Sequence, residues 1–359
     1  MIILSKKIGL ITFHRTTNFG SLLQTFALYR KIEDLGHVCE VIDYRCPAIE
    51  KRENLSKKTI DKNLKTTIRN ILFLPGYKDK ARKMNKFIYS NMNVSDEYGL
   101  DSIKNSNEQY DKFMVGSDIV WGRDITEDDY TYFLEFVEDP RKKYAFASSV
   151  GDYSFRGDED RVSSLLNEFN RIAVRENDAI EWINKIGGPR SEWVCDPTML
   201  LTADEWKKYI MPKYYPDEYV LVYFRDPKGK CSADAIKYAK KNHCKVLFIN
   251  YDFPVKGMKN VKPKTLEEFL GLILNAKMIF TASYHGMLFS TYFNKEFLFY
   301  TRAHKSRVLS LAERLELNQN CGDEIDVDRY ESIDYIVVNH HLQKFREASI
   351  KVLAEMLNE

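Results

Sequence analysis

The chain has 359 residues, of which 44% are hydrophobic and 13% aromatic, and its 54 basic residues nearly balance its 52 acidic residues. A chain of roughly twice the usual domain length predicts two domains, each with enough apolar residues for a core of its own. The balanced charge argues against a protein that binds nucleic acid over its whole surface. No apolar run reaches the roughly eighteen residues of a membrane-spanning helix, so we expect no such span.

The cysteines and the N-terminus point to the cytoplasm. The first ten residues contain no small-residue cleavage site and do not resemble a signal peptide. The six cysteines form no C-x-x-C pair and no metal-ligand spacing, which is typical of reduced thiols. They are Cys39, Cys46, Cys195, Cys231, Cys244 and Cys321.

The N-terminal region reads as a strand, a helix and a second strand. Ile8–Phe13 is an apolar run, and a polar loop follows it at residues 14–20. Apolar residues at helical spacing predict a helix over Ser21–Leu35, which ends before Gly36. Val38–Tyr44 is the second predicted strand. A strand, a helix and a strand within so few residues form a βαβ unit, which predicts a parallel sheet.

The same alternation continues to about residue 300. Two capping boxes, Thr202 with Glu205 and Thr265 with Glu268, predict helix starts, and a further helix is predicted over residues 177–186. The alternation predicts two doubly wound, Rossmann-like α/β domains that face a cleft. The further predicted strands are residues 112–115, 143–147, 171–174, 192–195, 219–224, 245–250, 278–281 and 296–300.

The predicted domains meet near residue 196. Residues 1–195 form the first domain and contain a basic helical insertion at 45–110, and residues 196–330 form the second. Residues 331–359 form a helical segment that we expect to cross back over the first domain.

The insertion is strongly basic. Lys51–Lys86 contains 12 basic residues and only 3 acidic residues, and its apolar run Ile71–Gly76 is predicted to end in a turn. One interpretation is a solvated helical insertion. The other is a surface that meets anionic lipid or an acceptor that carries a diphosphate.

Polar residues follow most of the predicted strands. In parallel α/β sheets, ligands bind beyond the carboxyl ends of the strands, where free N–H groups of helix N-termini favour anions. The residues at these ends carry hydroxyl, carboxylate, imidazole and cationic groups, which suits an anionic, phosphate-bearing substrate. They are His14, Asn18, Gly20, Ser117, Asp118, Ser148, Ser149, Arg175, Arg225, Ser283, His285, Arg302, His304 and Lys305.

Several common signatures are missing. The sequence contains no P-loop, no G-x-G-x-x-G, no H-E-x-x-H and no G-x-S-x-G. Two acidic triplets, Asp158–Asp160 and Asp326–Asp328, have a form that can hold a divalent cation, but such triplets are common on surfaces. We therefore assign no metal site.

Five segments in order resemble the polysaccharide pyruvyl transferase family. Ile11–Gln24 is similar to the family's opening strand, Asn-aromatic-Gly turn and Gln-bearing helix, and Gly116–Trp121 resembles its Gly-Ser-Asp-x-x-Trp block. The pair Arg175-Glu176, the segment Asp196–Thr198 and the block Ser283–Gly286 match later family motifs. The resemblance runs from residue 8 to about residue 318, nearly the whole chain.

The resemblance implies a GT-B-like fold with the acceptor on the first domain and the donor on the second. The implied enzyme is a transferase that moves pyruvate from phosphoenolpyruvate onto a sugar of a cell-surface polysaccharide or its lipid-linked precursor, forming a ketal. It implies no cofactor beyond the donor substrate and leaves a metal requirement open. Many relatives carry Arg-Leu-His where this chain has Ser283-Tyr284-His285, so one donor-binding cation is either absent or supplied elsewhere, with Arg302 and Arg307 as candidates.

Each candidate residue has a structural alternative. His285 is the candidate general acid, because imidazole gives and takes protons near neutral pH; the alternative is a structural histidine. Arg175 is the candidate clamp for the donor's phosphate or carboxylate; the alternative is an ion pair with Glu176 or another neighbour. Asp118 is a candidate base for the acceptor hydroxyl or a cap for the next helix.

The remaining candidates would bind substrate. Ser117 either contacts phosphate or caps a helix, and Asn18 and Gly20 are expected mainly to shape their turn. The proposed binding set is Arg175, Asn18, Gly20, Ser117, Ser283, Arg302, Lys305 and His14.

Two other functions stay open at this point. One is a nucleotide-sugar-dependent glycosyltransferase on the same GT-B architecture, and the other is a non-catalytic glycan-binding subunit of envelope biosynthesis. We expect a cytoplasmic protein that associates peripherally with anionic membrane at its inner face and does not bind nucleic acid.

Overall fold

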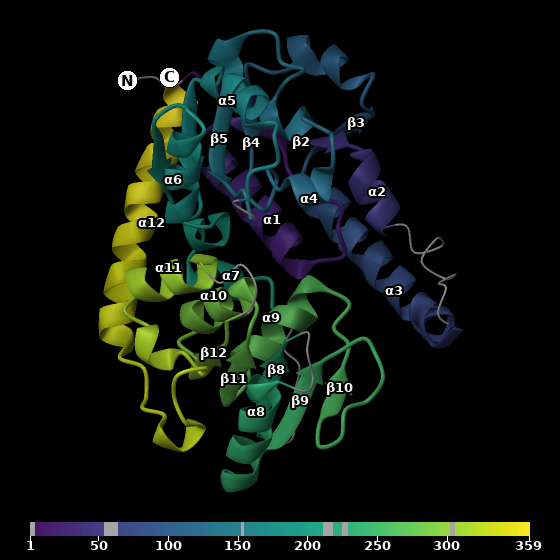
Figure 1. Cartoon of the computed structure of the whole chain (residues 1–359), viewed down its shortest axis with the longest axis vertical. Helices are drawn as coiled ribbons and strands as arrows, with labels where there is room; N and C mark the ends of the chain where they lie inside the picture. Colours follow the sequence, from purple (N-terminus) through teal and green to yellow (C-terminus); the bar gives the residue numbers. More distant parts are fainter. Residues whose placement is uncertain (1–3, 54–63, 152–153, 211–217, 225–228, 302–305) are drawn as a thin grey trace. The chain divides into compact units, whose positions relative to one another are not determined.

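The computed structural model describes residues 4–53, 64–151, 154–210, 218–224, 229–301 and 306–359. These residues form two compact units (Figure 1). The first unit comprises Met1–Asn54, Asn85–Leu201 and Lys344–Glu359, and the second comprises Leu55–Met84 and Thr202–Gln343.

The first unit contains a seven-stranded sheet in the order β3-β2-β1-β4-β5-β6-β7. Every neighbouring pair is parallel, as the βαβ pattern predicts. Since β1 lies between β2 and β4, the chain reverses its winding direction at the β1/β4 boundary, the topological switch point of the sheet. The strands are β1 (Lys7–Ile11), β2 (Val38–Tyr44), β3 (Val94–Tyr98), β4 (Lys112–Val115), β5 (Lys143–Ser148), β6 (Arg171–Val174) and β7 (Ser191–Trp193).

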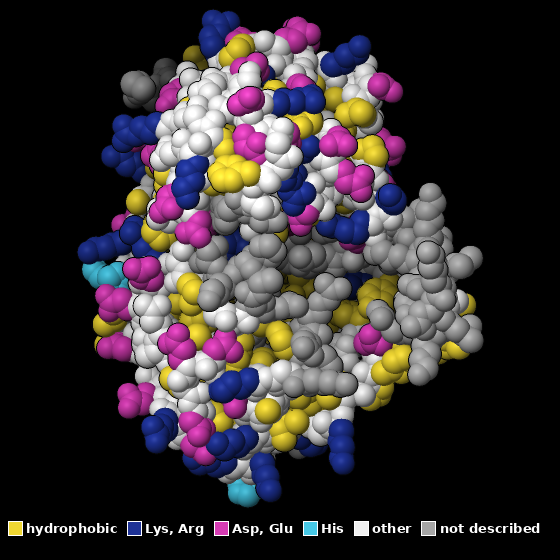
Figure 2. Space-filling model, viewed as in Figure 1, with side chains coloured by type: hydrophobic (Ala, Val, Ile, Leu, Met, Phe, Trp, Pro, Cys, Tyr) yellow, Lys and Arg dark blue, Asp and Glu magenta, His cyan; other side chains and the backbone are white. Residues whose placement is uncertain are grey.

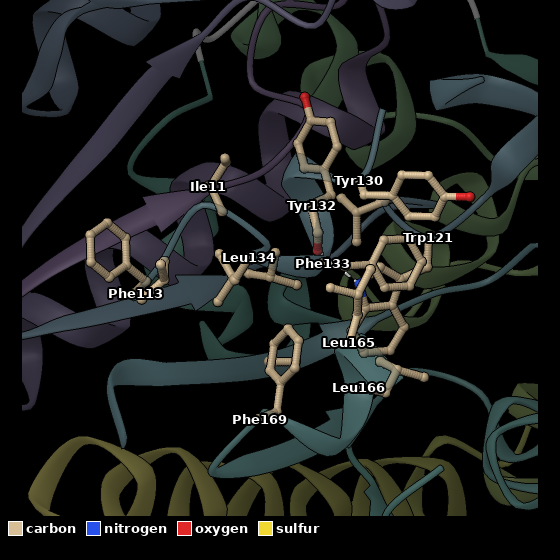
Figure 3. Close-up of a cluster of buried hydrophobic side chains, with 14 of the residues drawn as sticks. Ile11, Phe113, Trp121, Tyr130, Tyr132, Phe133, Leu134, Leu165, Leu166 and Phe169 are labelled. Atoms are coloured by element: carbon tan, nitrogen blue, oxygen red, sulfur yellow. Dashed lines mark hydrogen bonds between the residues drawn. The ribbon is translucent and has the colours of Figure 1, made fainter. Parts of the chain in front are cut away.

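A hydrophobic core cluster of the first unit is rich in aromatic side chains (Figure 3). Trp121 is fully buried, its ring stacks on Phe133 with a centroid distance of 5.7 Å, and its Nε1 donates to the carbonyl of Tyr132 at 2.9 Å. Trp121 is therefore a core residue. The described helices with residues in this unit are α1 (Phe19–Asp34), α2 (Pro47–Glu53), α3 (Leu64–Asn91), α4 (Arg123–Thr126), α5 (Glu159–Asn167), α6 (Asn177–Lys185) and α12 (Tyr335–Asn358).

The last residues of the chain pack on the first unit. Ser349 Oγ accepts a hydrogen bond from the backbone N–H of Cys195 at 2.9 Å, and Arg346 Nε donates to the carbonyl of Met199 at 2.5 Å. Near the end of α12, the buried Lys112 ammonium donates to the carbonyl of Met356 at 2.6 Å. A cation at a helix C-terminus satisfies a carbonyl that has no partner within the helix.

The second unit contains a five-stranded parallel sheet in the order β10-β9-β8-β11-β12. Its switch point lies between β8 and β11. The strands are β8 (Tyr219–Tyr223), β9 (Lys245–Ile249), β10 (Lys259–Val261), β11 (Met278–Thr281) and β12 (Phe297–Phe299). The described helices are α7 (Ala203–Lys207), α8 (Lys230–Lys241), α9 (Leu266–Leu274), α10 (Tyr284–Tyr292), α11 (Ser306–Arg314), and parts of α3 and α12.

The structure confirms both helix starts that the capping boxes predict, with one difference in the hydrogen bonds. Thr202 and Glu205 form a complete capping box at α7. At α9, Thr265 accepts from the N–H of Glu268, but the Glu268 carboxylate accepts from the N–H of Lys264 at 2.8 Å and not from that of Thr265. The second capping box is therefore incomplete, because its glutamate bonds to the residue before the N-cap.

The turn predicted after Ile71–Leu74 is wrong, because α3 continues through Pro75 and Gly76. Proline inside a helix removes one hydrogen bond and disturbs the preceding turn. Packing offsets this cost: Phe73 meets Phe253 with ring centroids 5.2 Å apart, and Tyr77 stacks on Tyr251 at 5.7 Å.

The surface carries charges of both signs. On the face shown in Figure 2, Lys and Arg side chains are interspersed with Asp and Glu side chains over the described residues. Among the described helices, none is both long enough and apolar enough to cross a membrane.

Candidate active-site residues at the two switch points

The loops after β1 and β4 meet at the switch point of the first sheet. The Thr12 hydroxyl, one residue beyond β1, donates to the carbonyl of Ser117, two residues beyond β4, at 2.7 Å. Gln24 of α1 is fully buried and its Nε2 donates to Thr12 Oγ1 at 3.0 Å. Sequence reasoning missed Thr12 as a site residue and used Gln24 only as part of a family motif.

Asp118 occupies an unusual backbone conformation at this point. Its φ of 79° lies in the left-handed region, which residues other than glycine rarely adopt. One carboxylate oxygen accepts from the backbone N–H of Ile119 at 2.8 Å, and the other accepts from the Ser21 hydroxyl. The N-cap of the following helix α4 is Gly122, so the capping alternative for Asp118 is wrong. Strain of this kind is concentrated at functional sites.

Asn18 and Gly20 shape the start of α1. The Asn18 side chain is the N-cap and accepts from the backbone N–H of Gly20 at 2.9 Å. Asn18 is exposed, whereas Gly20 is buried. Their expected role in the turn is confirmed by this cap.

His14 lies in a buried polar cluster. Its Nε2 contacts Asp43 at 3.0 Å and its Nδ1 contacts the carbonyl of Thr12 at 3.2 Å. Asp43 also accepts from Arg45 at 2.9 Å and from the Tyr89 hydroxyl at 3.2 Å. Burial alone would raise the pKa of Asp43, but the hydrogen bonds and charges of His14 and Arg45 lower it to about 2. With 2% of its surface exposed, His14 is a buried member of this polar cluster.

Arg175 lies at the carboxyl end of β6 between two carboxylates. Its Nη1 is 3.2 Å from Asp196 Oδ2 and donates to Ser117 Oγ at 3.2 Å, and its Nε is 3.4 Å from Glu176 Oε2. Glu176 in turn accepts from Ser149. Arg175, Ser117 and Asp196 are all buried, so the ion-pair alternative holds in this structure. Donor binding by Arg175 stays a proposal.

The Ser283–Gly286 block lies at the switch point of the second sheet, directly after β11. Ser283 is the N-cap of α10, where its hydroxyl accepts from the N–H of Gly286 at 3.3 Å. His285 is half-buried in the first turn of that helix. A Cβ on Gly286 would lie 2.3 Å from Thr281 Oγ1, so glycine permits α10 to approach β11 this closely.

Some candidates lie outside the described residues. They are Arg225, Arg302, His304 and Lys305.

The acidic triplets have cationic partners. Asp158 pairs with Arg123 at 2.8 Å, and Asp328 pairs with Lys237 at 2.8 Å. In the part of the chain that the structure describes, no group of three or more His, Cys, Asp or Glu side chains could hold a metal ion.

These features define the class of protein. Two parallel α/β sheets, each with polar loops at its switch point, form two Rossmann-like units of the kind found in GT-B enzymes. The chain itself belongs to the polysaccharide pyruvyl transferase family, whose model matches residues 18–304, and it is therefore a transferase.

Solved structures share this fold at low sequence identity. Arabidopsis thaliana UGT89C1 complexed with UDP-L-rhamnose is 8% identical, with a TM-score of 0.53 over 99% of this chain and 100% of that chain. A putative UDP-N-acetylglucosamine 2-epimerase from Listeria monocytogenes is 10% identical, with a TM-score of 0.53 over 98% and 95%. The Neisseria meningitidis UDP-GlcNAc 2-epimerase bound to UDP-GlcNAc is 9% identical, with a TM-score of 0.53 over 98% and 99%. No curated protein matches the sequence significantly. At these identities the likeness shows the fold alone.

Proposed function

We propose that this protein transfers the pyruvyl group of phosphoenolpyruvate to two hydroxyls of one sugar, forming a ketal on a cell-surface polysaccharide or its lipid-linked precursor. The observation that carries the proposal is the family match over residues 18–304. Further support comes from the family-like blocks Gly116–Trp121 and Ser283–Gly286, which follow β4 and β11 at the switch points of their sheets.

The reaction balances without an oxidant or a reductant. A proton adds to the methylene carbon of phosphoenolpyruvate, which becomes the methyl group, and positive charge develops at the central carbon. One sugar hydroxyl attacks that carbon and loses its proton. The bond between the central carbon and the bridging oxygen breaks and phosphate leaves. The second hydroxyl then attacks that carbon and gives its proton to the departing phosphate, which closes the ketal. Because the reaction involves no net oxidation or reduction, the proposal needs no redox cofactor.

The described residues suit this sequence of proton transfers. We assign the proton for the methylene carbon to His285 and the removal of the acceptor proton to Asp118. The hydrogen bonds of Asp118 to Ser21 and to the Ile119 N–H fix the direction of its remaining lone pairs. Asp118 belongs to the first unit and His285 to the second.

In this proposal, cationic side chains bind the negatively charged groups of the donor. Arg175, helped by Arg302 and Lys305, would hold the phosphate or carboxylate. Glu176 and Asp196 already balance the Arg175 guanidinium, so an anionic donor has to displace one of these carboxylates or bind with the other cations as well.

The remaining candidates would position other side chains or lie at helix N-termini that favour anions. Ser117 is buried against Arg175 and His14 against Asp43, so we assign both to positioning. Asn18 and Ser283 cap helices at the two switch points, where free backbone N–H groups favour anions.

The test follows the fate of a labelled oxygen. Phosphoenolpyruvate carrying ¹⁸O in the bridging position is incubated with the protein and a lipid-linked oligosaccharide or polysaccharide fraction, and phosphate is followed by ³¹P NMR. We expect labelled phosphate to appear together with a ketal carbon in the ¹³C spectrum of the glycan. Unlabelled phosphate would place the cleavage at the P–O bond and exclude pyruvyl transfer. An identical reaction with a chelator tests for a metal requirement.

One alternative is a nucleotide-sugar glycosyltransferase, because UGT89C1, a solved structure with the same fold, is complexed with UDP-L-rhamnose. Stabilisation of the protein by UDP or GDP but not by phosphoenolpyruvate would favour it. Peripheral contact with anionic membrane at the inner face is also part of our proposal.

A further inference from the structure

One side of α3 is apolar and exposed at its N-terminal half. Ile68, Ile71 and Leu72 expose 55%, 58% and 59% of their surface, and Pro75 is exposed as well. Positions i, i+3, i+4 and i+7 share one side of a helix, so these four residues form one patch, which we call the apolar tip. Single exposed apolar residues are normal, but neighbouring ones on one helix face indicate a contact surface.

The opposite side of α3 is already occupied within the second unit. Phe73 packs on Phe253, Tyr77 stacks on Tyr251, and the Lys80 ammonium lies 4.5 Å from the centre of the Tyr251 ring. These contacts hold the helix so that its apolar tip faces away from the unit.

The same outward side becomes basic toward the C-terminus of α3. Lys78, Arg82 and Lys86 are exposed and follow the tip at helical spacing; we call them the cationic band. Asp79 lies beside the band and contacts Lys264 at 2.6 Å and Arg82 at 2.8 Å. These cations lower the pKa of Asp79. Lys83 also lies 3.8 Å from Asp79, so cations outnumber this one carboxylate.

An apolar tip and a cationic band on one side of a helix suit an anionic membrane surface, which offers an apolar interface and charged headgroups. Helices that bind such surfaces lie in the plane of the interface and bury their apolar side about 5–10 Å deep. Lysines and arginines near the surface are attracted to anionic headgroups.

We propose that the outward side of α3 binds an anionic lipid bilayer, with Ile68, Ile71 and Leu72 entering the interface and the cationic band contacting headgroups. The inference rests on the proposed function only in that a lipid-linked acceptor would bring the enzyme to this surface. Binding to vesicles requires neither donor nor acceptor, so a failure here leaves pyruvyl transfer untouched.

The test uses the full chain and phosphatidylcholine vesicles with and without one third of phosphatidylglycerol, separated by flotation at low and high salt. We expect binding to the anionic vesicles only, and loss of most of it at high salt, because surface charges are screened. Ile71→Asn with Leu72→Asn should weaken binding roughly tenfold or more. Lys78→Gln, Arg82→Gln and Lys86→Gln together should weaken it roughly a hundredfold, since each charge contributes about fivefold.

Matched controls change similar residues elsewhere. Ile336 of α12 is 86% exposed, and Lys344 and Lys351 are exposed on the same helix, so Ile336→Asn and the double variant Lys344→Gln with Lys351→Gln should bind as the parent does. Unchanged melting temperatures show that all variants fold.

Three results would overturn the proposal: no binding to anionic vesicles at low salt, equal losses in the control variants, or no loss in the α3 variants. Self-association that Ile71→Asn abolishes, without vesicle binding, would make the tip an interface between two copies.

Discussion

The Ser21 hydroxyl donates a hydrogen bond to the Asp118 carboxylate across 97 positions of sequence. This contact joins the first turn of α1 to the loop after β4 at the switch point of the first sheet. It holds the carboxylate of a residue whose backbone is strained, with φ at 79°. Such a contact is expected where the direction of a carboxylate matters to the chemistry.

Ser21→Ala tests this positioning role. Without the hydroxyl, the Asp118 carboxylate can rotate, so we expect kcat to fall by roughly tenfold while the affinity for phosphoenolpyruvate stays near that of the parent. Ser21→Thr keeps the hydroxyl and should restore most of the rate. A loss of donor affinity equal to the loss of kcat would place Ser21 in donor binding, and full activity of Ser21→Ala would remove the contact from the mechanism.

Arg175→Lys and His285→Gln separate donor binding from proton transfer. Lysine keeps the charge of Arg175 but loses the planar fork, so donor affinity should fall about ten- to 150-fold, which corresponds to about 1.5–3 kcal/mol. Glutamine cannot deliver a proton, so His285→Gln should lower the chemical rate by roughly a hundredfold with donor affinity near normal. Calorimetric titration and single-turnover kinetics measure the two effects.

Two results would contradict these roles of Arg175 and His285. Equal loss of donor affinity in both, with an unchanged chemical step, would make His285 a binding residue. If Arg175→Lys lowers the melting temperature but binds the donor normally, Arg175 stabilises the fold through its ion pairs with Glu176 and Asp196 and does not bind the donor.

Asp43→Asn should make stability less sensitive to acid. The folded-state pKa of Asp43 is about 2, below its ordinary value of 3.8. The carboxylate therefore contributes stability that is fully present above about pH 4 and is lost as the pH falls toward 2. We expect the variant to lose about 2 kcal/mol at neutral pH, and its difference from the parent to shrink over this range. Urea unfolding at several pH values measures it; a difference that is constant from pH 7 to 2 would contradict the assignment.

Gly286→Ala should disturb the start of α10. The added Cβ would lie 2.3 Å from Thr281 Oγ1 and 2.9 Å from Tyr223 Cδ1, so the helix has to shift. Overpacking of this kind costs about 1–3 kcal/mol. Thermal unfolding is the measurement, and a parental melting temperature for Gly286→Ala would contradict the close approach.

The sequence predicts the buried strands well because their apolar runs are continuous. Residues 38–44, 112–115, 171–174 and 278–281 are strands with the predicted bounds. The strands β3 and β10 were missed, since both lie at sheet edges and their residues, VSDEY and KNV, carry little hydrophobic pattern. Helix α3 was misread because Pro75 and Gly76 indicate a turn locally, whereas the packing of Phe73 and Tyr77 that sustains the helix is tertiary.

The positions of the candidate residues in the fold were more predictable than their contacts. The rule that ligands bind beyond the carboxyl ends of strands correctly places Ser117, Asp118 and His285 at such ends. Spacing along the chain does not reveal that His14 meets Asp43, or that Arg175 lies between Glu176 and Asp196. These pairings depend on which loops the strand order brings together.

Parallel calorimetric titrations with phosphoenolpyruvate and with UDP test the central claim most directly. The proposed pyruvyl transferase should bind phosphoenolpyruvate, weakly in Arg175→Lys and normally in His285→Gln, and should not respond to UDP. Binding of UDP with no response to phosphoenolpyruvate would contradict it.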